Sequence, residues 1–296
     1  MHKDNAVPVL ALLAGALVWG LIWYPYRVLG DAGIAGATAS FLTYFLALLP
    51  GLWIFRAQLA RFRNAPWLLG AIALSAGWCN LAYVLAMVRG EVMQVLLLFF
   101  LAPLWTVLFA RMLLGERPGP IGYLVIGLSI GGAAVMLWEP EARLPTLASP
   151  AEWLALSAGM AFALANVLSR KAQVLEPGIK ALGVWFGVSV ISLPVMLVLE
   201  SPATALLSVG MQTWIFLLLV AAVIFAVNVA VQEGLTRTAA NRAIVILLTE
   251  LAFGAVSSYF LAGESMGARQ WIGGTMLVAA TLFSGHLEAR ISAARA

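Results

Sequence analysis

The sequence predicts an all-α integral membrane protein in which ten transmembrane helices form a 5+5 inverted repeat. Three observations predict this fold class: the composition, the length of the apolar runs and a weak internal repeat. Hydrophobic residues make up 63% of the 296 residues and charged residues only 10%, whereas soluble domains average about 45–50% and about 25%. The apolar residues come in runs of about 17 to 25, the length that crosses a bilayer core. We therefore expect the lipid bilayer to surround the chain.

Ten candidate spans follow one another along the chain. The first resembles the hydrophobic region of a signal peptide, but it is longer and further spans follow it, so we expect it to remain uncleaved. An even number of spans places both termini on the same side of the membrane. Charges, Pro and Gly bound the spans at about 7–26, 36–55, 66–88, 92–112, 119–138, 151–169, 181–199, 212–232, 241–262 and 268–286.

The basic residues predict the orientation. All seventeen Lys and Arg residues lie near the ends of the predicted spans or in the loops. Because cytoplasmic loops carry an excess of these residues, we assign the larger set of thirteen to the cytoplasm, together with both termini. The opposite side keeps four: Arg27, Arg89, Arg143 and Arg269. The net charge of +4 is thus a signal of topology, and we expect no nucleic-acid partner.

One polar linker, 139–150, separates a first five-helix repeat at 1–138 from a second at 151–296. The linker ends in the sequence Ser-Pro-Ala-Glu at 149–152. This pattern is typical of a capping box with Pro at the first helical position. We expect the sixth helix to begin sharply at this point.

The two halves share a weak sequence register. At an offset of 143 the first and sixth spans align, pairing Arg27 with Arg170 and Trp19 with Phe162. Because each half has an odd number of helices, the two copies insert with opposite orientation, as in many secondary transporters. Channels can be built in the same way. At an offset of 148 the matches are Asn80 with Asn228, Arg89 with Arg237, Gly115 with Gly263, and Glu116 with Glu264.

These features resemble the EamA family of the drug/metabolite transporter superfamily. The marks are Trp19-Gly20, Pro103, Leu114-Gly115-Glu116, the stretch from Gly127 to Gly132, Ala262-Gly263-Glu264 and Gly273-Gly274. The second half departs from the first, because Leu251 stands where the first half has Pro103. The aromatic residues make the chain most similar to the YddG-type aromatic amino-acid exporters. The resemblance implies an exporter of the bacterial inner membrane with a cavity between the halves.

Polar residues deep in the spans are the first candidates for a binding site, because a polar group in lipid is costly without a partner. Glu250 lies near the middle of the ninth span, where it would receive a substrate ammonium or carry a coupling proton. Asn80, Asn166 and Asn228 offer amides that can bind both a carboxylate and an ammonium. The alternatives are a structural carboxyl and amides that hold neighbouring helices together.

Aromatic residues in the middle of spans are candidates for the cavity lining, where they would contact an apolar or aromatic side chain or a cation. Ordinary helix packing is the alternative for each. Pro103 is a candidate hinge, because proline removes an intrahelical hydrogen bond. The candidate lining residues are Trp19, Trp23, Trp78, Tyr83, Phe100 and Trp185.

We expect no enzyme, cofactor or metal site. The two histidines, His2 and His286, are terminal, and no metal-binding or phosphate-binding motif is present. The single cysteine, Cys79, excludes an intrachain disulfide. The expected function is export of neutral or aromatic amino acids, or related small metabolites, by alternating access. A multidrug or organic-cation exporter, a passive channel and a membrane-embedded enzyme or scaffold are the alternatives.

Overall fold

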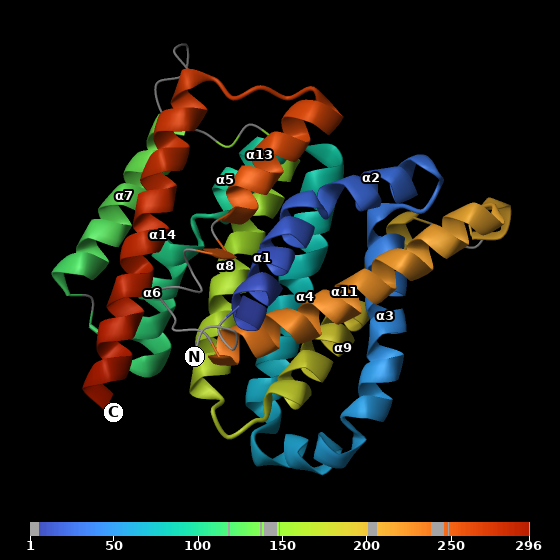
Figure 1. Ribbon diagram of the computed structural model, residues 1–296, viewed down its shortest axis with the longest axis horizontal. Helices are drawn as coiled ribbons and strands as arrows, with labels where there is room; N and C mark the ends of the chain where they lie inside the picture. Colours follow the sequence, from blue (N-terminus) through green and yellow to red (C-terminus); the bar gives the residue numbers. More distant parts are fainter. Residues whose placement is uncertain are drawn as a thin grey trace.

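A computed structural model describes residues 6–117, 119–136, 138, 147, 149–200, 206–237, 246–247 and 249–295. Within these residues every regular element is helical (Figure 1). The elements before the predicted linker are α1 (Ala6–Leu21), α2 (Trp23–Asp31), α3 (Gly36–Ile54), a short 3₁₀ helix η1 (Arg56–Asn64), α4 (Pro66–Arg89), α5 (Val92–Phe99), α6 (Ala102–Leu114) and α7 (Pro120–Met136). They are followed by α8 (Pro150–Lys171), α9 (Pro177–Val195), a π-helical turn η2 (Met196–Glu200), α11 (Met211–Arg237), α13 (Thr249–Ala262) and α14 (Ala268–Arg295).

Seven helical stretches of the described chain are long and apolar enough to cross a membrane. Helix α7 is a shorter apolar helix, and α13 and α14 fall where the ninth and tenth spans are predicted. Part of the ninth predicted span, at 241–245 and 248, and most of the predicted linker lie outside the described residues. The structure is thus that of a multi-pass helical membrane protein, while the number of ten spans and the side of the termini stay predictions. The seven stretches are Val7–Asp31, Gly36–Ile54, Pro66–Arg89, Val92–Leu114, Pro150–Lys171, Pro177–Glu200 and Met211–Val231.

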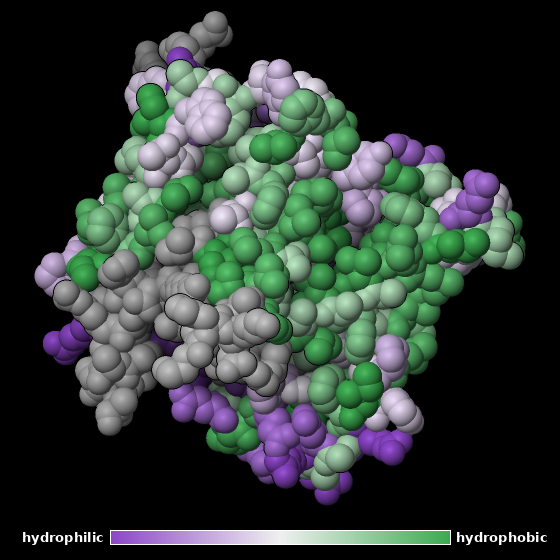
Figure 2. Space-filling view, viewed as in Figure 1, coloured by the Kyte–Doolittle hydropathy of each residue, from purple (hydrophilic) through white to green (hydrophobic). Residues whose placement is uncertain are grey.

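The outer surface fits a lipid environment. Figure 2 shows apolar residues over the middle of one face and hydrophilic residues gathered towards its lower and right-hand edges. Large apolar side chains are well exposed on several helices, such as Val198 at 74% and Phe260 at 76%. Exposed apolar side chains of this kind would be costly in water, but lipid solvates them.

Helix α4 is the centre of the bundle and packs against both α8 and α9. Glycines bring the backbones of α4 and α9 together. A Cβ atom placed on Gly77 would lie 2.5 Å from the carbonyl oxygen of Gly187, and one on Gly187 would overlap the backbone of Ala73. Because neither position has room for a side chain, both glycines are required for this crossing.

Two spans are interrupted next to a proline. Ile22 separates α1 from α2, three residues before Pro25, and Phe100 and Leu101 separate α5 from α6, just before Pro103. Proline cannot donate the backbone hydrogen bond to the carbonyl four residues earlier. The chain therefore leaves the helix at the turn that precedes each proline.

Three helix boundaries follow the chemistry of their residues. At the start of α8, Ser149 Oγ accepts a hydrogen bond from the Glu152 backbone N–H at 3.3 Å, which confirms the serine cap of the predicted capping box. Gly115 and Gly263, after α6 and α13, have φ angles of 71° and 68°. Positive φ favours glycine at the end of a helix. The same chain reversal therefore follows α6 and α13.

Candidate functional site

A cluster of polar side chains lies inside the bundle between α3, α4 and α13. The Asn80 amide Nδ2 on α4 donates a hydrogen bond to the Tyr44 hydroxyl on α3 at 2.8 Å. The other amide atom, Asn80 Oδ1, and the Tyr83 hydroxyl are buried and have no hydrogen-bond partner among the described residues. Glu250 on α13 lies within electrostatic range of Tyr83 and Cys79. We call these four residues the central cluster: Tyr44, Asn80, Tyr83 and Glu250.

Glu250 reaches this position because α13 packs closely on α1. A Cβ atom placed on Gly20 of α1 would lie 2.7 Å from the Glu250 carbonyl oxygen and 3.0 Å from the Gly254 backbone nitrogen. Gly20 therefore lets the two backbones touch at the level of Glu250. The interruption at Ile22 follows directly, so the Glu250 backbone lies beside a broken helix. The Glu250 side chain itself is partly buried.

Aromatic rings line one side of the central cluster. The Tyr83 and Phe99 rings meet edge to face, with centroids 5.1 Å apart. Phe99 also contacts Phe100 at 6.0 Å and Phe162 of α8 at 5.2 Å. This group supplies an apolar, π-rich surface next to the unpartnered polar atoms. Of its members, Tyr83 and Phe100 are among the predicted lining residues.

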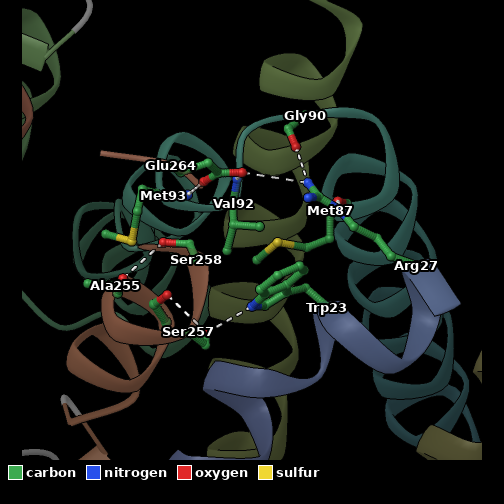
Figure 3. A network of polar contacts seen from close by, with 11 residues as sticks. Trp23, Arg27, Met87, Gly90, Val92, Met93, Ala255, Ser257, Ser258 and Glu264 are labelled. Carbon is green, nitrogen blue, oxygen red and sulfur yellow. Dashed lines mark hydrogen bonds and ion pairs between the residues drawn. The ribbon is translucent and has the colours of Figure 1, made fainter. Parts of the chain in front are cut away.

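Trp23, another predicted lining residue, is instead part of the packing between α2 and α13. It is 2% exposed, and its indole Nε1 donates to Ser257 Oγ at 3.0 Å (Figure 3). Ser257 Oγ also lies 3.2 Å from the Gly20 carbonyl oxygen. Trp19, one turn earlier on α1, is partly buried and packs against the core. Trp23 therefore fixes the position of α13 relative to the first half of the chain.

The remaining predicted residues lie elsewhere in the bundle. Trp185 is 1% exposed and packs on Phe225 with ring centroids 5.3 Å apart. Trp78 is 42% exposed, and its Nε1 donates to Ser157 Oγ of α8 at 3.2 Å. Neither ring takes part in the described contacts of the central cluster.

Two of the three predicted amides also have separate environments. Asn228 Nδ2 donates to the Ile224 carbonyl of its own helix at 2.9 Å, and Asn166 is exposed on α8. Among the described residues no hydrogen bond joins Asn228 to Asn80. The structure thus brings Asn80, Tyr83 and Glu250 together with Tyr44, a residue that is not among the candidates predicted from the sequence.

Pro103 lies buried in the first turn of α6. Because it has no N–H, the Phe99 carbonyl lacks its usual partner in the helix. That carbonyl faces α8, where a Cβ atom placed on Gly159 would lie 2.5 Å from the Phe99 oxygen. The interruption of this span therefore rests directly against α8, next to the ring that contacts Tyr83.

Charged residues form a second polar network at one end of the bundle (Figure 3). The Arg27 guanidinium lies 4.9 Å from the Trp23 ring centre and donates to the carbonyl oxygens of Met87 and Gly90 at 3.0 and 2.6 Å. It also faces Glu264, with 3.8 Å between Nη2 and Oε1. In the sequence, these charged residues indicate only the topology and the repeat. The repeated Arg and Glu positions were the signal that could have identified the network.

The described residues include no group of three His, Cys, Asp or Glu that could hold a metal ion. The site consists instead of one carboxyl group, one amide, two phenols and a cluster of rings within an apolar bundle. Such a constellation can bind a small solute that carries both polar groups and an apolar part. It defines a helical membrane protein with a group of polar side chains between its spans.

Comparison with known proteins identifies the family. The model of the EamA-like transporter family matches residues 6–138 and 149–285. The chain belongs to this family, and hence to the drug/metabolite transporter superfamily, whose EamA members are transporters.

Solved structures share the fold. Sixteen solved chains match, and one of them, described only as "Crystal structure of protein", has 17% sequence identity and a TM-score of 0.60 over 97% of this chain and 99% of its own. At this identity the similarity concerns the fold alone. A search of curated proteins found no significant match.

Proposed function

We propose that the protein is a secondary transporter that exports aromatic or neutral amino acids, or related small metabolites, across the bacterial inner membrane. The observation that carries the proposal is the central cluster, where Glu250 lies within electrostatic range of Tyr83. Among the described residues, the buried Tyr83 hydroxyl and Asn80 Oδ1 have no hydrogen-bond partner. Buried polar atoms without partners cost free energy. A bound solute would supply the missing hydrogen bonds.

The chemistry of the central cluster suits an amino acid. The Glu250 carboxylate and the Asn80 carbonyl oxygen are acceptors for an ammonium group, and the Tyr83 hydroxyl is a donor for a carboxylate. The rings of Phe99 and Phe100 offer stacking contacts to an aromatic side chain. Phosphorylated solutes fit less well, because they require Lys or Arg, and the sequence places these residues at span ends and in loops.

The packing of the helices supports an inverted repeat with alternating access. Helix α4, the third span, packs on α8 and α9, the sixth and seventh. Helix α11, the eighth span, packs on α1 and α3, the first and second. Exchanging the two halves converts one set of contacts into the other. Two inverted halves can exchange conformations, and such an exchange opens a central site first to one side and then to the other.

An organic-cation exporter is the second candidate, and Glu250 beside aromatic rings is the observation that favours it. A carboxylate and a ring face both attract a cation. A passive channel is the candidate of another class. It would conduct without saturation or countertransport, so the same experiment separates it from a carrier.

The test is a transport screen in proteoliposomes that compares labelled aromatic and neutral amino acids, organic cations and sugars, with and without a proton gradient. We expect saturable accumulation of an aromatic amino acid.

Glu250→Gln should lower the transport rate by about tenfold or more and remove its dependence on pH if Glu250 carries the coupling proton. The matched control is Glu91→Gln, since Glu91 is exposed at the start of α5. Absence of accumulation or exchange for every solute would refute the carrier, and an unchanged Glu250→Gln variant would remove Glu250 from the site.

A further inference from the structure

Two Arg–Glu pairs connect the halves of the chain. Arg27 faces Glu264, with 3.8 Å between Nη2 and Oε1, and Arg170 faces Glu116, with 3.0 Å between the corresponding atoms. In each pair one residue belongs to the first stretch matched by the family model, 6–138, and the other to the second, 149–285. A movement of one half relative to the other must therefore strain or break these pairs.

The two pairs occupy equivalent places in the two halves. Arg27 aligns with Arg170, and Glu116 aligns with Glu264. Each glutamate follows a glycine with positive φ and closes the end of its helix in the same way. The backbone N–H of Glu116 bonds to the Ala110 carbonyl at 3.3 Å, and that of Glu264 to the Ser258 carbonyl at 3.2 Å. The same local fold thus presents a carboxylate to an arginine twice.

The pairs lie at opposite ends of the bundle. Glu264 accepts hydrogen bonds from the backbone N–H groups of Val92 and Met93, at the start of the span Val92–Leu114. Glu116 follows directly after the end of this span. At a rise of about 1.5 Å per residue, a continuous helix of this length would be roughly 35 Å long, against a bilayer core of about 30 Å. Even with the interruption at Phe100 and Leu101, the two carboxylates therefore lie at opposite ends of a membrane-spanning stretch.

Each pair closes its end of the bundle through more than one bond. At the first end, Arg27 holds the last carbonyls of α4 while Glu264 holds the first N–H groups of α5 (Figure 3). At the other end, Lys171 Nζ donates to the Leu113 carbonyl at 3.1 Å, next to the Arg170–Glu116 pair. The side chains of Arg27 and Arg170 are 27% and 30% exposed. Ion pairs that are partly exposed in this way contribute little net stability, so they can break and re-form in each transport cycle.

From this arrangement we propose that Arg27–Glu264 and Arg170–Glu116 are the two gates of the transporter, which break alternately as the central cluster opens to one side and then to the other. The inference rests on the proposed function, since only a carrier needs alternate gates. Its physical basis is the position of each pair, which joins the halves at one end of the bundle only. With both pairs formed, as in this structure, both ends are held closed.

The single cysteine provides a test that needs no substrate. Cys79 lies in the middle of α4, partly buried and within electrostatic range of Glu250. Its reaction with a membrane-impermeant maleimide reports which end of the bundle is open. The reagent is added to intact cells for one side and to inverted membrane vesicles for the other. On the predicted topology, Glu264→Gln should raise the labelling rate of Cys79 from outside by on the order of fivefold, and Glu116→Gln should raise it from the cytoplasmic side.

Matched controls remove a neighbouring charge at each end. Glu91→Gln lies next to Val92, and Arg117→Gln lies next to Glu116; both side chains are exposed. Neither control should change the labelling from either side. Where an amide variant does not fold, Glu264→Asp and Glu116→Asp replace it, with a smaller change in the same direction.

The outcome is independent of the solute screen. The gates are supported if Cys79 labelling increases from outside in Glu264→Gln and from the cytoplasmic side in Glu116→Gln, even if no solute in the screen is transported. Unchanged labelling in folded Glu264→Gln and Glu116→Gln proteins overturns the gates even if transport is found, and so does an increase from the same side in both variants. In those cases the pairs are static connections between the halves.

Discussion

The indole Nε1 of Trp23 donates a hydrogen bond of 3.0 Å to Ser257 Oγ, so α2 and α13 are joined inside the bundle although 234 positions separate the two residues. The bond lies beside the interruption at Ile22, and Ser257 is about two helical turns from Glu250 on α13. A buried N–H within a bilayer must find a partner in the protein. The bond therefore helps to hold Glu250 against the first half of the chain.

Removing this bond should weaken the fold measurably. Trp23→Phe keeps an aromatic ring but removes the donor, and Ser257→Ala removes the acceptor. We expect each variant to lower the free energy of unfolding by about 0.6–2 kcal/mol, the range for hydrogen bonds between membrane helices. The measurement is equilibrium unfolding in mixed micelles. The double variant should lose less free energy of unfolding than the sum of the single changes, because both remove the same bond. The control is Trp53→Phe, at a ring that is 68% exposed. Fully additive losses would contradict the pairing.

The crossing of α4 and α9 should not tolerate a side chain at Gly187. In Gly187→Ala the new methyl group would meet the backbone of Ala73, so the two helices must move apart. Overpacking of this kind costs about 1–3 kcal/mol, and we expect a clear decrease in the midpoint of thermal unfolding in detergent. Gly70→Ala, also on α4, is the control, because no atom lies within 4 Å of its added Cβ. Equal midpoints for the two variants would show that the crossing has room to adapt.

Pro103 should affect transport more than stability if it acts as a hinge. Pro103→Ala restores the N–H that can bond to the Phe99 carbonyl, so α5 and α6 can join into one continuous helix. We expect a slower transport rate in proteoliposomes with no loss in the thermal midpoint. Pro50→Ala is the control, because Pro50 lies inside α3, which continues past it to Ile54. A Pro103→Ala protein that transports at the original rate would exclude the hinge.

The central cluster should contribute to solute affinity through Asn80 and Tyr83. Asn80→Ala and Tyr83→Phe each remove an atom that has no partner among the described residues. We therefore expect a rise of about fivefold or more in the solute concentration at half-maximal transport, equivalent to about 1 kcal/mol for one hydrogen bond. Tyr83→Phe should have little effect on folding, whereas Asn80→Ala also removes the hydrogen bond to Tyr44 and should lower stability. The measurement is concentration-dependent uptake. Asn166→Ala serves as the control at an exposed amide, and a larger effect at Asn166 than at Asn80 would place the site elsewhere.

Much of the fold could be predicted from the sequence, because hydropathy and charge report directly on contact with lipid. Ser149 at the start of α8 and the glycines after α6 and α13 are local signals that need no knowledge of other helices. The interruptions are harder to predict. Pro50 lies within α3, which continues past it to Ile54. Pro194 lies one residue before α9 passes into the π-helical turn η2, and α5 ends four residues before Pro103. A proline removes the same bond in every case, and the packing of neighbouring helices decides whether the helix ends.

The site could be predicted only in part, for the same reason. A polar residue in a span stands out in the sequence, and so Asn80 and Glu250 could be selected. Nothing in the sequence distinguishes Trp185, which is packed against Phe225, from a ring that faces a cavity. Tyr44 becomes part of the site only because α3 lies beside α4. The Arg–Glu pairs were missed because each pair joins residues that are distant along the chain.

The pairing of α7 with α14 has a consequence for how the protein is made. Their backbones touch at glycines, since a Cβ atom on Gly132 would lie 2.9 Å from the Gly273 carbonyl oxygen, and each is the other's main neighbour. At synthesis rates of about 5–20 residues per second, α7 leaves the ribosome on the order of ten seconds before α14. During this interval its glycine face is covered only by lipid or by the insertion machinery. A chain stopped before Ala268 should keep that exposed face permanently, and pulse-chase labelling should show it being degraded faster than the full chain.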